Sequence, residues 1–195
     1  MLFRSQHINK TEDINNNIFR NPFLVEQGQY TDHLYLRKVI QEQMSYLTND
    51  RFRFYSTAWS SVSVKNEFLL GSSFSNYLER SASKLFAVNM KIQKIWVNIN
   101  PQGAYQQRHM HPEYDAAGTY YVFCPHNSGD ITFYNPSPVV EVFNKTRPFY
   151  QFTYTHRPSE GDMLIWPGYL QHEVSYNYTD ATRISISYCL NAVIK

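Results

Sequence analysis

The chain has 195 residues, with 18 basic and 16 acidic side chains and a formal net charge of +2. This length suits one domain with a single core, and the balanced charge excludes the basic surplus that marks a nucleic-acid-binding face. Two cysteines are too few for a disulfide framework, and with neither a membrane-spanning apolar run nor a signal peptide we expect a cytoplasmic protein with reduced thiols.

Residues 1–90 are predicted to form an arm and supporting helices. The first 30 residues are polar, with one short strand expected at Asn17–Val25. A helix is predicted from an N-cap at Thr31 to about Asp50, because apolar residues recur there at three- and four-residue steps. A short strand is expected around Ser61–Val64, and a second helix at Phe74–Val88.

Residues 91–195 change in texture to short aromatic and β-branched runs broken by Asn, Pro and Gly, which favours strands. The expected strands are residues 92–100, 104–111, 118–124, 129–135, 148–154, 161–167, 172–176 and 183–190. The fold class predicted is mainly β with N-terminal helices, a double-stranded β-helix (jelly roll, cupin-like barrel) with the helices against one outer sheet face. We expect residues 1–195 to form a single domain.

The last predicted strand shows which face would line the barrel. Its polar residues alternate with apolar ones, so that Arg183, Ser185 and Ser187 point to one face. If that face lines the interior, Arg183 is a buried cation, which is costly unless it is paired. The pattern therefore predicts an anionic partner, either a protein carboxylate such as Asp162 or Glu173, or a ligand.

Three histidines are candidate metal ligands. His109 and His111 stand two residues apart in a predicted strand, hence on one face, and His172 is the best distant third ligand. Three imidazoles on one side of an ion leave open positions for water or substrate. His126 and His156 lie in loop-like contexts and are expected at the surface.

The order of these motifs resembles that of the iron- and 2-oxoglutarate-dependent dioxygenase superfamily, in particular its small bacterial and phage 2OG-Fe(II) oxygenase type with an HxHP motif. The resemblance covers roughly the last hundred residues and is specific in order and spacing. The motifs are Trp96-Val-Asn98, His109-Met-His111-Pro112, Ala117-Gly118, Tyr120-Tyr121, Gly129-Asp130-Ile131, Gly161-Asp162-Met163-Leu164 with Pro167, His172-Glu-Val174 and Arg183-Ile-Ser185-Ile-Ser187.

The resemblance implies Fe(II) as the metal, 2-oxoglutarate as cosubstrate and O2 as oxidant, with hydroxylation of an unidentified substrate. It implies that His109 and His172 are iron ligands and that Arg183 pairs with the distal carboxylate of 2-oxoglutarate. A hydrogen bond from Ser185 and contacts from Tyr121 and Asn98 are further implied roles in cosubstrate binding.

Position 111 departs from the pattern of most of the superfamily, which has Asp or Glu there. A three-histidine site would leave one more positive charge on the iron complex. Two alternatives to His111 are open: a register shift would bring in Glu113, and Asp115 could fold back to the metal.

Two other functions compete with the oxygenase. Gly103, His109, His111 and Asp115 nearly reproduce the first cupin motif, which suggests a cupin-type metal protein that does not use 2-oxoglutarate. A non-enzymatic jelly roll with a zinc or vestigial site is the other alternative. No nucleic-acid or membrane partner is expected, and the oligomeric state is open, with a homodimer as one option.

Overall fold

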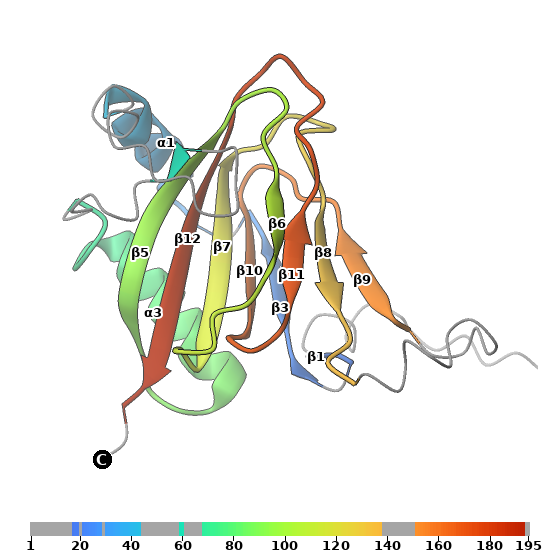
Figure 1. Cartoon of the computed structure of the whole chain (residues 1–195). Helices are drawn as coiled ribbons and strands as arrows, with labels where there is room; N and C mark the ends of the chain where they lie inside the picture. Colours follow the sequence, from blue (N-terminus) through green and yellow to red (C-terminus); the bar gives the residue numbers. More distant parts are fainter. Residues whose placement is uncertain are drawn as a thin grey trace, which may run out of the picture.

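The computed structural model describes residues 17–19, 21–28, 30–43, 59–60, 68–137 and 151–193. Most of their strands form two antiparallel sheets that face each other, with the helices on the outer side of the larger one (Figure 1). The larger sheet has the order β3-β10-β7-β12-β5-β4 and the smaller one β6-β11-β8-β9. This confirms the predicted double-stranded β-helix, mainly β with N-terminal helices. No helix in the described part is long and apolar enough to cross a membrane.

The elements have the following bounds. The larger sheet contains β3 (Leu24–Gln27), β4 (Trp59–Ser60), β5 (Met90–Asn100), β7 (Ala116–Phe123), β10 (Asp162–Pro167) and β12 (Arg183–Ala192). The smaller sheet contains β6 (Gln106–His109), β8 (Ile131–Tyr134), β9 (Thr153–His156) and β11 (His172–Val174). The remaining elements are the pair β1 (Asn17–Ile18) and β2 (Asn21–Pro22), and the helices α1 (His33–Glu42) and α3 (Ser73–Phe86).

The two helices cover one face of the larger sheet, as predicted. Leu36 and Ile40 of α1 and Phe74 and Leu78 of α3 are buried in one cluster with side chains of the sheet. Ser72 caps α3 by accepting a hydrogen bond from the backbone N–H of Ser75. The first helix begins one position later than predicted, with Asp32 at the N-cap, and its predicted continuation over 44–50 lies outside the described residues.

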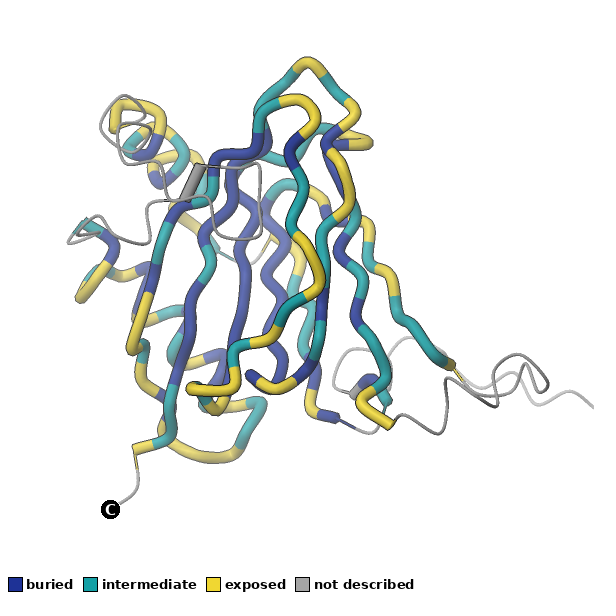
Figure 2. Tube along the Cα trace, viewed as in Figure 1, coloured by how far each residue is buried: buried dark blue, intermediate teal, exposed yellow. Residues whose placement is uncertain are grey.

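The alternation predicted for the last strand is confirmed in β12. Ile184, Ile186 and Tyr188 belong to the core on the helix side of the sheet, and Arg183 and Ser185 line a cavity on the other side. Figure 2 shows that β7, β10 and β12 are buried along most of their length. The larger sheet is therefore covered on both faces, by helices outside and by the smaller sheet inside.

The other predicted strands overlap the observed ones, with shifts at their ends. The single strand expected at Asn17–Val25 is wrong: Phe19 has a φ of 50°, a left-handed conformation between two short paired strands. The strand expected at Ser61–Val64 and the first residues of the one at 148–154 lie outside the described part.

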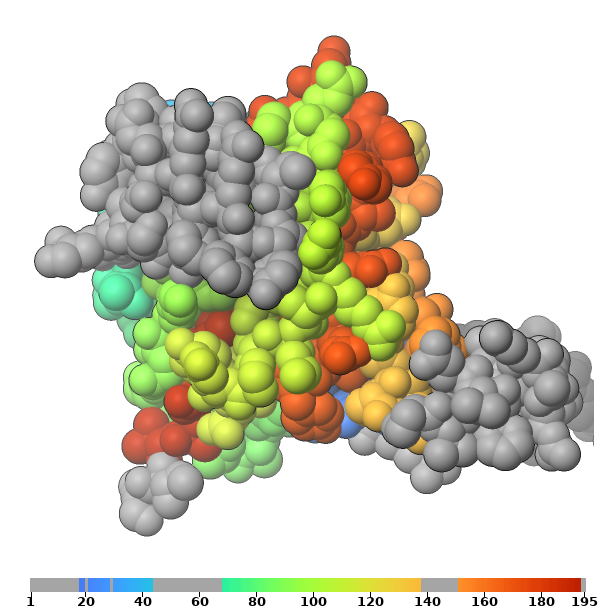
Figure 3. Space-filling model, viewed as in Figure 1, coloured from blue at the N-terminus to red at the C-terminus, as the bar shows by residue number. Residues whose placement is uncertain are grey.

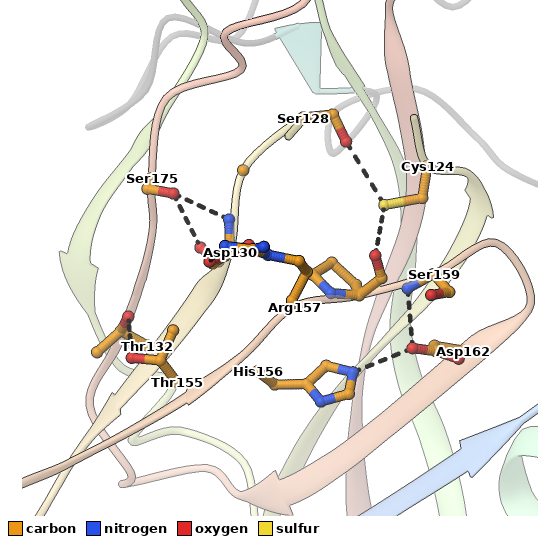
Figure 4. Close-up of polar contacts among 12 residues, drawn as sticks. Cys124, Ser128, Asp130, Thr132, Thr155, His156, Arg157, Ser159, Asp162 and Ser175 are labelled. Carbon is orange, nitrogen blue, oxygen red and sulfur yellow. Dashed lines mark hydrogen bonds and ion pairs between the residues drawn. The ribbon is translucent and has the colours of Figure 1, made fainter. Parts of the chain in front are cut away.

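His156 is also not the surface loop residue that was expected. It ends β9, and its Nε2 donates to the buried carboxylate of Asp162 over 3.0 Å (Figure 4). His126 is exposed, as predicted.

Candidate metal centre and cosubstrate cavity

The structure brings together the three predicted histidines. His109 ends β6 and pairs across the strands with His172, the first residue of β11. His111 lies beyond the strand, in the following loop, where its backbone N–H donates to the carbonyl of Gly168 over 2.7 Å. One ligand nitrogen from each ring lies within 4.8 Å of the other two, so a single metal ion can be shared.

Backbone carbonyls orient two of these rings. Nδ1 of His109 lies 2.7 Å from the carbonyl oxygen of Gln107, and Nδ1 of His172 lies 2.9 Å from that of Leu170. Since a carbonyl can only accept, Nδ1 carries the hydrogen in both rings and Nε2 keeps its lone pair. This is the arrangement that fixes the tautomer of metal-binding histidines.

Burial keeps the three imidazoles neutral. It lowers the pKa of His109, and it lowers the pKa of His172 well below the usual value, with the neighbouring histidines adding to the effect. Burial, His109 and Lys94 together lower the pKa of His111 to about 4. Neutral imidazoles are the form that binds a metal, so the cluster is ready for one at neutral pH.

The two acidic alternatives to His111 are placed differently. The Asp115 carboxylate accepts the backbone N–H of Ala192 over 2.8 Å, while its own N–H donates to Asn191. Glu113 is exposed and lines the cavity that contains the histidines. Among the described residues, neither carboxylate joins the group of ligand atoms that the three histidines form.

A cavity of about 440 Å³ extends from the histidines to Arg183 between the two sheets. Arg183 is only 2% exposed, and its Nη1 donates to the carbonyls of Ser128 (2.8 Å) and Gly129 (3.2 Å). Its Nε has no partner, and no carboxylate of the described residues pairs with it. Of the two suggested protein partners, Asp162 accepts from His156 and from the backbone of Ser159 instead, and Glu173 is hydrogen-bonded to Tyr134.

The other predicted cosubstrate residues line the same cavity. Ser185 is the cross-strand partner of both Tyr121 and Asn98. Burial raises the pKa of Tyr121, so its hydroxyl remains a hydrogen-bond donor. The amide of Asn98 is engaged within the protein: its oxygen accepts from Trp96 Nε1 over 3.0 Å, and its nitrogen donates to Ser187 over 2.8 Å.

Two cavity residues were missed by the sequence analysis. The buried side-chain atoms without a hydrogen-bond partner, among the residues the structure describes, are Arg183 Nε, Asn100 Oδ1 and Trp166 Nε1, and all three residues line this cavity. Asn100 pairs across the strands with Arg183 and is 3% exposed. Its position two residues after Asn98, on the same strand face, was the signal that could have identified it.

Unpaired buried polar atoms indicate a polar ligand. A carboxylate would satisfy Arg183 Nε, and the second carboxylate and keto oxygen of a 2-oxo acid are oxygen donors suited to a metal held by imidazoles. The residues present therefore fit both the metal and the cosubstrate that the family pattern implies.

Comparisons with known proteins agree with this geometry. Residues 94–188 match the family described as "Putative 2OG-Fe(II) oxygenase". In its sequence, the chain matches no curated protein.

Solved structures are similar over most of the chain. The alpha-ketoglutarate-dependent epimerase SnoN of nogalamycin biosynthesis is 15% identical, with a TM-score of 0.63 over 89% of this chain and 77% of its own. A prolyl-4-hydroxylase from Pseudomonas putida is 10% identical, with a TM-score of 0.62 over 89% and 94%. EctD from S. alaskensis, solved with 2-oxoglutarate and 5-hydroxyectoine, is 14% identical, with a TM-score of 0.66 over 89% and 73%. At these identities the likeness shows the fold.

Proposed function

We propose that His109, His111 and His172 hold the iron of a 2OG-Fe(II) oxygenase, the family that residues 94–188 match, and that Arg183 anchors its 2-oxoglutarate. In the reaction 2-oxoglutarate loses CO2 and becomes succinate. One oxygen atom of O2 enters the succinate carboxylate, and the other enters a C–H bond of the substrate.

The protein's part is to bind, orient and exclude water. The bound iron supplies the activation of O2. The carbonyls of Gln107 and Leu170 accept from Nδ1 of His109 and His172, which leaves Nε2 of both rings available to a metal ion. The apolar walls of the cavity, including Ile131, Trp166 and Val174, limit access of water to the reacting atoms.

The observation that supports the cosubstrate role is the buried guanidinium of Arg183, whose Nε has no hydrogen-bond partner among the described residues. Two backbone carbonyls orient one of its nitrogens, and they leave its positive charge without a counter-ion in the described structure. A carboxylate in the cavity would supply the counter-ion, and Tyr121 and Ser185 stand beside it as hydroxyl donors. A cupin-type or purely structural barrel has no use for such a cation, so these alternatives are not favoured.

His111 is proposed as the third ligand because its ring completes the group of nitrogens, whereas Asp115 is bonded to the end of β12. The test is the iron content of variants reconstituted without oxygen. We expect His111→Ala to lose most of the iron and His111→Asp to retain it, while Glu113→Gln, Asp115→Asn and the surface control His126→Ala stay at the wild-type level. Retention by His111→Ala together with loss by Glu113→Gln would assign the ligand to Glu113.

Turnover provides the second test. Succinate should be released from 2-oxoglutarate by the iron-loaded protein and should fall to background in His172→Ala. Tight zinc binding without any succinate release under anaerobic iron loading followed by O2 would contradict the enzyme.

A further inference from the structure

The outer end of the cavity carries groups that neither the metal nor 2-oxoglutarate uses. Lys94 and Trp96 reach it from β5, Glu113 and Tyr114 from the segment after β6, and Cys189 from β12. Figure 3 shows the face on which the yellow-green residues of the β6–β7 segment lie beside dark red residues of β12. This end is where a primary substrate would meet the histidines.

The rim has one cation and one carboxylate that are not paired with each other. Lys94 is exposed and has no carboxylate partner among the described residues, whereas Lys91 on the same strand binds Glu79 over 2.6 Å. Glu113 likewise has no basic partner in the described part. Lys94 pairs across the strands with Cys189, and Lys94, Glu113 and Cys189 line the same cavity. Burial raises the pKa of the Cys189 thiol to about 12, an effect that Lys94 opposes and Glu113 reinforces.

The wall between the rim and the histidines is a fixed aromatic ring. The Trp96 indole donates to Asn98, which in turn donates to Ser187, so its orientation is set by two successive hydrogen bonds. Its ring centroid lies 6.0 Å from that of His111, and Lys94 Nζ lies 5.8 Å from the Trp96 ring. An apolar group lying along Trp96 would therefore reach from Lys94 to the metal ligands.

We propose that the primary substrate is a free α-amino acid, whose carboxylate binds Lys94, whose ammonium group binds Glu113 and whose side chain lies along Trp96 toward the histidines. This rests on the proposed oxygenase function. Two unpaired charges of opposite sign fit a zwitterion, and a cavity of about 440 Å³ shared with 2-oxoglutarate leaves room for a small molecule. A nucleic acid would need a track of cations, and among the described residues Lys94 is the one lysine or arginine at this rim.

Binding can be measured without turnover by loading the protein with zinc and 2-oxoglutarate. A pool of the proteinogenic free L-amino acids is screened by ligand-observed NMR, and each hit is titrated calorimetrically. The same amino acid is then tested as its α-amide and as its N-acetyl derivative. We expect the free amino acid to bind, and each blocked form to bind roughly tenfold more weakly because it lacks one charge-assisted contact.

Variants assign each charge to its partner. Lys94→Met should weaken binding of the free amino acid roughly tenfold and leave binding of the α-amide unchanged. Glu113→Gln should also weaken binding of the free amino acid roughly tenfold, and it should leave binding of the N-acetyl form unchanged. Lys84→Met, on the exposed surface of α3, makes the same charge change as Lys94→Met away from the cavity. It should alter the binding of neither the free amino acid nor its α-amide.

The proposal is overturned if no amino acid in the pool binds, if blocked and free forms bind equally, or if Glu113→Gln loses zinc. Normal zinc and 2-oxoglutarate binding in that experiment would leave the oxygenase function standing. Failure of zinc or 2-oxoglutarate to bind would contradict the proposed function itself.

Discussion

Two buried ionisable side chains, Asp162 and Arg183, differ in how completely they are paired. Asp162 is 1% exposed, and its carboxylate accepts from His156 at 3.0 Å and from the backbone of Ser159 at 2.9 Å (Figure 4). Arg183 is similarly buried, at 2%, but among the described residues it has no counter-ion and its Nε has no hydrogen-bond partner.

The difference is that between a structural group and a group proposed to bind a ligand. A buried charge that is paired and hydrogen-bonded holds elements together, here the end of β9 and the start of β10. A buried charge without a partner costs free energy in the ligand-free protein, and the cost is offset only when a ligand arrives. Asn100 and Trp166 line the same cavity and also have unpaired atoms, so they resemble Arg183 and not Asp162 in this respect.

The largest expected effect is at Arg183. Arg183→Met should weaken 2-oxoglutarate binding at least about a hundredfold, while the ligand-free protein unfolds with an unchanged or higher free energy because an uncompensated charge is removed. Calorimetric titration and denaturant unfolding of the zinc-loaded and metal-free protein measure the two quantities. Arg157→Met, an exposed arginine paired with Asp130, should leave 2-oxoglutarate binding unaltered. Strong destabilisation by Arg183→Met would show that the guanidinium has a structural partner.

Asp162 should respond in the opposite way. Asp162→Ala removes the partner of His156 and should lower the free energy of unfolding by about 3 kcal/mol, with 2-oxoglutarate affinity of the folded protein retained. Urea unfolding measures this, and the exposed Asp32→Ala serves as the control, since Asp32 makes no side-chain cap bond. A loss of 2-oxoglutarate binding without a loss of stability would contradict the structural role of Asp162.

The metal-free protein should lose stability in acid through its histidines. The pKa of His111 is lowered from 6.5 to about 4 in the folded state, so between these values the unfolded chain binds more protons than the folded one. The contribution of His111 to the free energy of unfolding should therefore be constant above about pH 6.5 and should decrease as the pH drops toward about 4. Unfolding free energies across this range should show a slope that His111→Phe reduces and that His126→Ala does not. A flat profile would mean that the imidazole is solvated.

The smallest effect is expected for a lone unpaired donor. Trp166→Phe removes an N–H that has no partner in the described structure, so stability should change by less than about 1 kcal/mol. Trp96→Phe removes an N–H that donates to Asn98 and should cost about 1 kcal/mol. Thermal unfolding of the two variants measures both changes in stability. A larger loss of stability in Trp166→Phe than in Trp96→Phe would show that the Trp166 indole has a hydrogen-bond partner.

The sequence by itself determined the class of fold and the composition of the site. Alternation along 183–190 predicted which face of β12 meets the helices and which lines the cavity, because side chains of a strand alternate wherever it lies. The spacing of His109 and His111 and the order of the later motifs predicted three histidines and one arginine around one cavity, and the family match over 94–188 agrees. Strand alternation and the order of motifs can both be read along the chain, without knowledge of long-range contacts.

Only the tertiary structure decided which polar groups are already satisfied. Asn98 is bonded to Trp96 and Ser187, Asp115 to Ala192, and Asp162 to His156, whereas Arg183 and Asn100 keep unpaired atoms. These pairings join strands as far apart in sequence as β5 and β12, and pairing depends on distances of about 3 Å that only packing sets. The distinction between a paired structural carboxylate and a guanidinium proposed to bind a ligand therefore appears only once the two sheets have closed around the cavity.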